Sequence, residues 1–286
     1  MIAFISGSET ILGMDKWAYR GMLTGTFVNR NNYATDAGLT ILCLAALAIR
    51  RFSGLGFRGV LRRLLVDGDK TSWLLLIGGL ITLTSLLFSG SRAGCAATLF
   101  GAIGLALALM RFEGGRLIFG IGSLAVMGLS YYAIQSDTTG DGSSVFDDRL
   151  TLYWVTLGAI GEHPWTGTGL GSFSAVYGMI RPETFLAVWD NVHNTYLQLI
   201  LELGVVAALS QLVAIGWLVW RCARGARSRR RNQVFPALGF AASVLVGSHV
   251  LVDFSLEIPA IAGLYAALLG IGVAQSWSSA DPTAEG

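Results

Sequence analysis

Charged residues are scarce in this chain of 286 residues. Asp, Glu, Lys and Arg together make up 13% of it, whereas soluble globular proteins carry about 25%. Hydrophobic residues make up 53%, and the mean hydropathy is +0.60. This composition excludes an ordinary soluble domain and indicates a chain that lies mostly in lipid.

Cysteines are also few, and their positions exclude two kinds of site. Cys43 and Cys95 fall inside long apolar runs, and Cys222 falls at the end of another. None lies in a segment that we place outside the membrane, so we expect neither a disulfide framework nor a metal site, and no cofactor. We also expect no cleavable leader, because the first 15 residues have neither a basic start nor a cleavage pattern.

Seven apolar runs approach the roughly 20 residues that a helix needs to cross a bilayer. They are Tyr33–Ile49, Ser72–Ser89, Ala93–Met110, Leu117–Ile134, Tyr196–Trp220, Val234–Val252 and Ile258–Trp277. We therefore predict an all-α polytopic membrane protein with about seven transmembrane helices. Its expected parts are an outer segment 1–32, four helices in 33–134, a large outer loop 135–195 with short interfacial helices, three helices in 196–277, and a cytoplasmic tail 278–286.

The basic residues orient this arrangement. Of the 20 Lys and Arg residues, six follow the first run, two follow the third and six follow the fifth. Cytoplasmic loops carry such an excess, so we place these loops inside and the 135–195 loop outside. The cluster Arg229–Arg231 fits a topology signal with contact to anionic lipid better than a nucleic-acid patch, and we expect no nucleic-acid partner.

Two of the basic residues predicted to lie outside stand where phosphate could meet them. Arg92 follows the small-residue turn Ser89–Ser91, and Arg149 opens a helix predicted to run to about Gly161. A guanidinium matches phosphate oxygens in a bidentate way, but an arginine at an interface can equally serve as an anchor. Tyr153 shares a helix face with Arg149, and the apolar residues of this helix predict that it lies on the membrane surface.

The cluster Gly167–Gly171 comes shortly after Pro164, which should end the preceding helix. It superficially resembles a phosphate-binding loop. It lacks the G-x-G-x-x-G spacing and does not stand between a strand and a helix. We therefore exclude a dinucleotide site and predict a tight turn that exposes its backbone.

His193 and Asn194 precede the fifth apolar run, at the predicted boundary of water and lipid. An imidazole there could act as a general base, or it could cap the helix that follows. Glu202 lies inside the run, where an ionisable residue suggests function, although a bond to a neighbouring helix is the simpler explanation. Two further sets of polar residues are predicted to lie at the outer side of the membrane. His249 and Asp253 could pair with each other, and Asn29, Asn31 and Asn32 could donate hydrogen bonds.

Taken in order, these motifs resemble the O-antigen ligase and polymerase superfamily of bacterial polysaccharide assembly. The resemblance covers about Gly25 to Ala267 and rests on Gly25–Asn29 with Asn31, Ser89–Arg92, Arg149–Trp154, Pro164–Phe173 and the histidine signature His193–Gly204. It implies transfer of a glycan from undecaprenyl diphosphate to an acceptor hydroxyl at the periplasmic face of the inner membrane, without metal or nucleotide. The acceptor would be a glycan or the lipid A core, and membrane lipids would surround the enzyme.

The resemblance also implies roles for single residues. Arg92 and Arg149 would bind the diphosphate, and His193 would activate the acceptor. We expect the substrate to be lined by Asn29, Asn31, Tyr153, Asn194 and His249.

Several alternatives stay open at this point. Ligase, polymerase and protein glycosyltransferase share the chemistry and differ in acceptor. Members of the superfamily usually have more spans than seven, so we expect N-terminal spans to be missing, and a non-catalytic subunit is possible. A transporter component is a further alternative, but it should show internal repeats and charges near mid-membrane.

Overall fold

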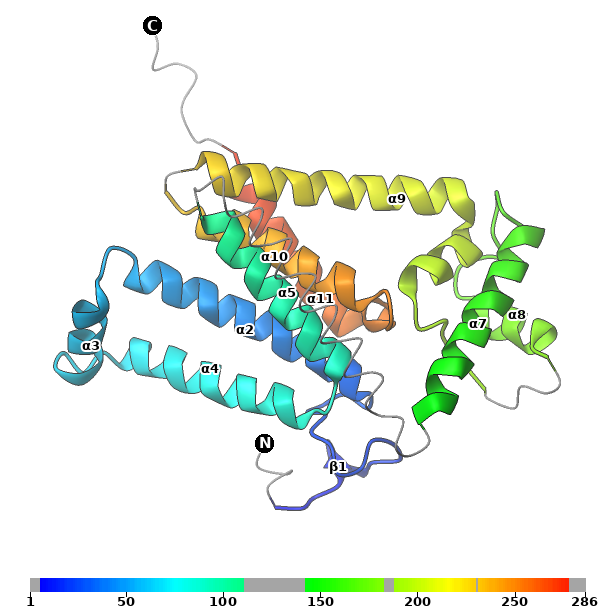
Figure 1. The fold of residues 1–286 in the computed structure, drawn as a ribbon, viewed down its shortest axis with the longest axis horizontal. Coiled ribbons are helices and arrows are strands. Elements are labelled where there is room, and N and C mark those ends of the chain that lie inside the picture. The colour runs from blue at the N-terminus through cyan, green and yellow to red at the C-terminus, as the bar shows by residue number, and fades with distance from the viewer. Residues whose placement is uncertain (1–5, 111–141, 183–187, 230, 278–286) are drawn as a thin grey trace, which may run out of the picture.

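The computed structural model describes residues 6–110, 142–182, 188–229 and 231–277 (Figure 1). Within these ranges the regular structure is helical except for a two-residue hairpin, in which β1 (Thr10–Ile11) pairs antiparallel with β2 (Met14–Asp15). The predicted all-α membrane class is therefore confirmed, with this hairpin as a small addition.

Six of the seven predicted spans are apolar helices. They are α2 (Arg30–Phe52), α4 (Lys70–Phe88), α5 (Arg92–Leu109), α9 (Thr195–Ser228), α10 (Val234–His249) and α11 (Pro259–Ala274). The first four are long and apolar enough to cross a membrane, while α10 and α11 are shorter, with 16 residues each. The predicted span Leu117–Ile134 lies outside the described residues.

Helix α10 is the centre of the bundle and packs against α2, α5, α9 and α11. Ala237, Ala241 and Leu245 of this helix are fully buried. Its neighbours approach closely because they carry glycine at the contact: a Cβ at Gly101 of α5 would lie 2.9 Å from the Cβ of Leu245. Small residues at such contacts allow the tight packing on which helix association in lipid depends.

Side-chain caps determine where α2, α4 and α5 begin. The side chain of Asn29 accepts a hydrogen bond from the Asn31 amide at the start of α2, at 2.7 Å. Asp69 and Ser91 do the same for α4 and α5. A cap satisfies amides that would otherwise lack an acceptor. The structure thus gives Asn29, a predicted substrate ligand, a structural role.

One helix was missed by the sequence reasoning. Helix α3 (Phe57–Leu65) lies in the basic segment between α2 and α4, which the hydropathy pattern predicts to be a loop. It carries Arg58 and Arg62 together with the exposed side chains of Leu61 and Leu65. Such a mixture of basic and apolar residues is typical of a helix that lies in a membrane interface.

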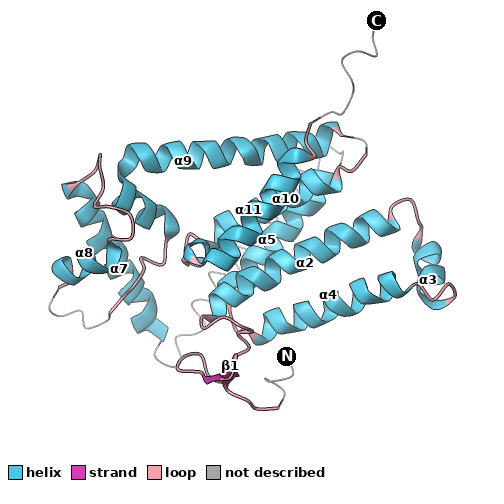
Figure 2. Cartoon of the chain, turned by 180° about the vertical axis from the view of Figure 1, so that it is seen from behind, coloured by secondary structure: helices cyan, strands magenta, loops and turns pink. Residues whose placement is uncertain are grey.

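Helices α7 (Gly142–Glu162) and α8 (Phe173–Ile180) stand apart from the bundle, beside the start of α9, in both views (Figures 1 and 2). They share a small core with α9, in which Leu152, Val192 and Leu201 are at most 1% exposed. The apolar face that we predicted for α7 is divided, because Trp154 stays 73% exposed. One side of α7 thus packs on protein, and another remains open to its surroundings.

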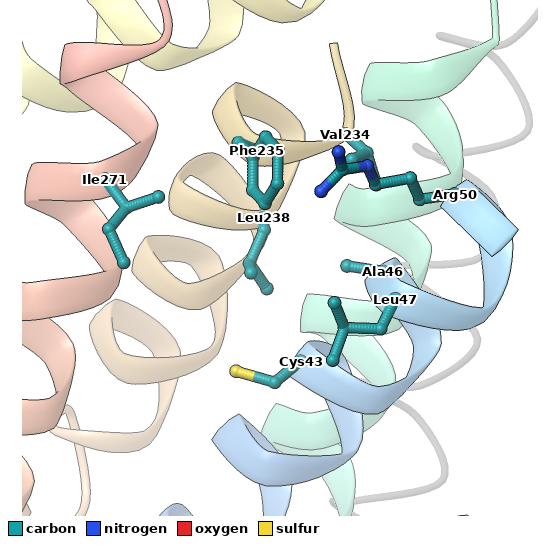
Figure 3. A pocket seen from close by; sticks show the side chains of 8 residues that line it. All are labelled: Cys43, Ala46, Leu47, Arg50, Val234, Phe235, Leu238 and Ile271. Carbon is teal, nitrogen blue, oxygen red and sulfur yellow. The ribbon is translucent and has the colours of Figure 1, made fainter. Parts of the chain in front are cut away.

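An apolar pocket of about 170 Å³ lies between α2, α10 and α11 (Figure 3). Its lining residues are Cys43, Ala46, Leu47, Arg50, Val234, Phe235, Leu238 and Ile271. Arg50 is at the last turn of α2, and its guanidinium lies 5.0 Å from the ring centre of Phe235. The pocket is therefore at the opposite ends of α2 and α10 from Asn31 and His249.

Candidate functional site

The glycine turn after α7 (Gly167–Gly171) packs against a kink of α9 and is bonded to it. Gly204 has φ 77° and ψ 163°, which interrupts the helix and frees the carbonyls of Leu201 and Glu202. Those carbonyls accept hydrogen bonds from the amides of Thr168 and Gly169, each at 2.9 Å. The predicted tight turn is therefore confirmed, although its amides are paired and not left exposed. Three of its amides bind α9, because the Gly171 amide also donates to the side chain of Glu202.

Close contact explains why glycines are needed here. A Cβ at Gly204 would lie 2.3 Å from the Trp165 carbonyl oxygen, and one at Gly167 would lie 2.5 Å from the Glu202 carbonyl oxygen. Both glycines also have positive φ, a region that other residues rarely occupy. The turn and the kink therefore require each other.

We expect Gly204→Ala to lower the thermal stability of the detergent-purified protein. The new methyl group would strike backbone atoms, and the positive φ would add a cost of about 1–3 kcal/mol. The matched control is Gly216→Ala in the same helix, where an added Cβ meets no atom within 4 Å. Equal melting temperatures for the two variants would contradict this account of the kink.

Glu202 connects the glycine turn to the segment that carries His193. Its Oε2 accepts from the Gly171 amide at 2.9 Å, and its Oε1 accepts from Gln198 Nε2 at 3.4 Å. Gln198 Oε1 in turn accepts from the Val192 amide at 3.0 Å. Our expectation of a bond to a neighbouring helix was wrong, because the partners are a turn and the same helix.

His193 lies just before α9 and is held between two aromatic rings. Asn194 caps the helix, accepting from the Leu197 amide at 3.1 Å, so the suggestion that His193 is the cap was wrong. The imidazole meets Trp189 and Phe254 edge to face, at centroid distances of 4.9 and 4.8 Å. These contacts fix the ring, while the backbone of His193 has φ +57°.

Burial and the nearby charge of Arg149 lower the pKa of His193 to about 4, and Asp253 opposes them only in part. The imidazole is therefore neutral at pH 7. Its Nδ1 is buried and has no hydrogen-bond partner among the described residues. A neutral ring with an unused nitrogen is the form that can accept a proton.

Arg149 and Tyr153 bring α7 to this histidine. Tyr153 donates a hydrogen bond from its hydroxyl to the His193 carbonyl at 3.0 Å. Arg149 donates from Nη1 to the Val252 carbonyl at 3.3 Å, and its buried Nε has no partner within the described part of the chain. The two side chains share a helix face, as their spacing predicts, and both act on the same site.

Asp253 follows α10 and connects it to α2 next to this site. It is fully buried and accepts from Asn31 Nδ2 at 3.3 Å and from the Ser255 hydroxyl. Asn31 Oδ1 accepts from Ser91 Oγ at 2.8 Å, which connects the start of α5 to the same network. Arg92 is the next residue after Ser91, and its side chain is exposed.

His249 is linked to Asp253 only indirectly. Thr35 Oγ1 lies 2.7 Å from His249 Nδ1 and 2.8 Å from Ser255 Oγ, and Ser255 bonds to Asp253. His249 and Asp253, which could pair by their spacing, are therefore linked through Thr35 and Ser255, and no direct hydrogen bond joins them within the described part of the chain. His249 is 1% exposed, and its Nε2 has no partner among the described residues.

The structure thus brings together Arg149, Tyr153 and His193, and it attaches Asn31 and His249 to them through Asp253. Sequence reasoning missed Trp189, Phe254 and Glu257, and it gave Asp253 too small a part. The available signal was the turn between two apolar runs, which holds an aromatic residue and two carboxylates within five positions.

These features define a class: a polytopic membrane protein with a polar site at one end of its helix bundle, covered by a separate helical segment. A family model described as O-antigen ligase matches residues 77–212, a range that contains Arg92, Arg149 and His193. Over these residues the chain is similar to the O-antigen ligase superfamily, and the match supports that family.

A curated relative agrees with this assignment. The General O-oligosaccharyltransferase of Acinetobacter baylyi is 26% identical over 125 residues. This alignment covers 43% of the present chain and 21% of the relative, so the match spans about a fifth of that protein's length.

Proposed function

We propose that this protein is a membrane glycosyltransferase that moves a glycan from an undecaprenyl-diphosphate carrier to an acceptor hydroxyl. The observation that carries the proposal is the meeting of a buried neutral imidazole, His193, with the guanidinium of Arg149 at the end of an apolar bundle. Both have a buried nitrogen without a partner among the described residues, and such atoms are usually satisfied by a ligand or by water.

The chemistry follows from these two groups. The acceptor oxygen forms a bond to the anomeric carbon of the glycan while its proton passes to His193. The bond between that carbon and the diphosphate oxygen breaks, and undecaprenyl diphosphate leaves as an anion. Arg149, with Arg92 as its proposed partner, stabilises this developing charge, which is usually the largest contribution to such catalysis. The step needs no metal and no nucleotide.

The placement in the cell belongs to the same proposal. We infer a bacterial inner-membrane location with His193 on the periplasmic side, 135–195 as the periplasmic loop and 278–286 as the cytoplasmic tail. The excess of basic residues in the segments predicted to be cytoplasmic supports this orientation. Asn31, Tyr153 and His249 would line the substrate, with Asn29 and Asn194 holding helix ends beside them. The acceptor would be a glycan or the lipid A core.

The test is transfer by the purified protein in lipid nanodiscs. An undecaprenyl-diphosphate oligosaccharide would be offered with three acceptors in turn: lipid A core, a second lipid-linked repeat and a serine-containing peptide. We expect one acceptor to gain the glycan, detected by mass spectrometry, with release of one undecaprenyl diphosphate per transfer in the presence of EDTA. Movement of intact donor across the bilayer without such release would overturn the proposal in favour of transport.

A further inference from the structure

Glu257 contacts both sides of the segment that carries His193. It lies in η1 (Ser255–Glu257), the turn that leads into α11. Its Oε1 accepts from Thr195 Oγ1 at 3.4 Å, two residues after the histidine. Its Oε2 faces the side-chain amide of Asn191, two residues before the histidine, and accepts from the amide nitrogen.

Gln198 gives Glu257 a third contact with the same segment. Its amide donates to Glu257 and also to Glu202, while its oxygen accepts from the Val192 backbone. The segment is thus held on both sides of a residue whose φ of +57° is uncommon for residues other than glycine. Such a conformation persists only when its surroundings impose it.

We propose that Glu257 is a positioning residue for glycan transfer, which holds the segment Asn191–Gln198 so that His193 points at the acceptor. This inference rests on the proposed function. The carboxylate bonds Thr195, Asn191 and Gln198, so it acts on His193 through their backbone and not through its ring. The three contacts converge on one short segment, which distinguishes Glu257 from a residue that merely satisfies a helix end.

The charge state of Glu257 makes this role dependent on pH. Burial and the nearby carboxylates of Glu202 and Asp253 raise its pKa to about 7, although the bonds from Gln198 and Thr195 oppose this shift. Of the other polar groups at this turn, Asn32 of α2 accepts from the Ser255 hydroxyl, and His249 of α10 is linked to Ser255 only through Thr35. An ionised carboxylate accepts all three hydrogen bonds, and protonation converts one acceptor position into a donor.

Two opposite trends follow as pH rises through 7. Transfer should become faster, because the ionised carboxylate holds the segment more firmly. Stability should fall, because the folded pKa lies above the ordinary value of 4.5 and the unfolded chain ionises more readily. His193 cannot produce the first trend, since its pKa of about 4 leaves it neutral throughout this range.

Glu257→Ala and Glu257→Gln test the inference, with Glu162→Gln at the exposed end of α7 as the matched control. We expect Glu257→Ala to lower kcat about ten- to a hundredfold, with the donor KM within about twofold of wild type. The amide of Glu257→Gln does not titrate, so its rate and melting temperature should lose their dependence on pH between 6 and 8. The control should behave as wild type.

Hydrogen exchange in the same variants gives a readout that needs no activity. Peptides covering 188–198 should exchange faster in Glu257→Ala, while peptides from α10 should not change. Unchanged exchange in 188–198 would overturn the role of Glu257 even if transfer occurs. If Glu257→Ala shows faster exchange but the wild-type protein transfers no glycan, the result would instead defeat the proposed function. If the alanine variant fails to fold, a pH profile of Glu257→Gln identical to that of wild type would overturn the inference.

Discussion

Replacing His193 by alanine is expected to slow glycan transfer about 10²–10⁴-fold, the usual contribution of a general base. The acceptor hydroxyl would lose its proton acceptor, while donor binding through the arginines would be retained. The measurement is kcat at saturating donor in nanodiscs, with donor affinity determined separately. Because the pKa of His193 is about 4, the wild-type imidazole should stay available from pH 8 down to about 5.

The matched control is His163→Ala. His163 is exposed, and its carbonyl, not its ring, bonds the Gly167 amide. We expect this variant to transfer glycan at the wild-type rate. A His193→Ala protein that folds and keeps a rate within about threefold of the control would exclude His193 as the base.

Removing Arg149 should be comparably severe. We expect Arg149→Ala to lower kcat about 10²–10³-fold, because one fixed donor to the developing charge is lost. Arg149→Lys should restore little, since an ammonium cannot form the bidentate contact. The variant should also raise the pKa of His193, because Arg149 is one cause of its low value. Loss of rate on acidification would then begin at a higher pH than in wild type.

Arg181→Ala serves as the control for this experiment. Arg181 is an exposed arginine directly after α8 and should affect transfer little. Both proteins would be compared for kcat, donor KM and the acid limb of the rate profile. An Arg149→Ala protein that matches Arg181→Ala in all three would remove Arg149 from the diphosphate site.

The main features of the fold were predictable because they are local in the sequence. Hydropathy is summed along a continuous run, so α2, α4 and α5 could be located to within a few residues. Helix α3 was missed because it is short and basic, and its apolar residues are too few to form a run. The length of α9 did not reveal its kink, because glycine is common within membrane helices.

The candidate site was predictable only in part. The shared face of Arg149 and Tyr153 follows from helical spacing, and their closeness to His193 was suggested by the order of the motifs. The partner of Glu202 was not predictable, because Gly171 reaches it only through the kink at Gly204. Asn194 and Asn29 illustrate the opposite error, since polar residues at a helix start often cap that helix.

The sequence by itself determined the membrane class, the positions of six helices and the glycines on which the turn depends. These properties depend on composition and on neighbouring residues. Only the tertiary structure decided that Asn31 meets Asp253, 222 positions away, and that Glu257 holds the segment around His193. Such contacts depend on how closely whole helices pack. Helix packing is set by the combined shape of many side chains, and no single sequence motif contains that information.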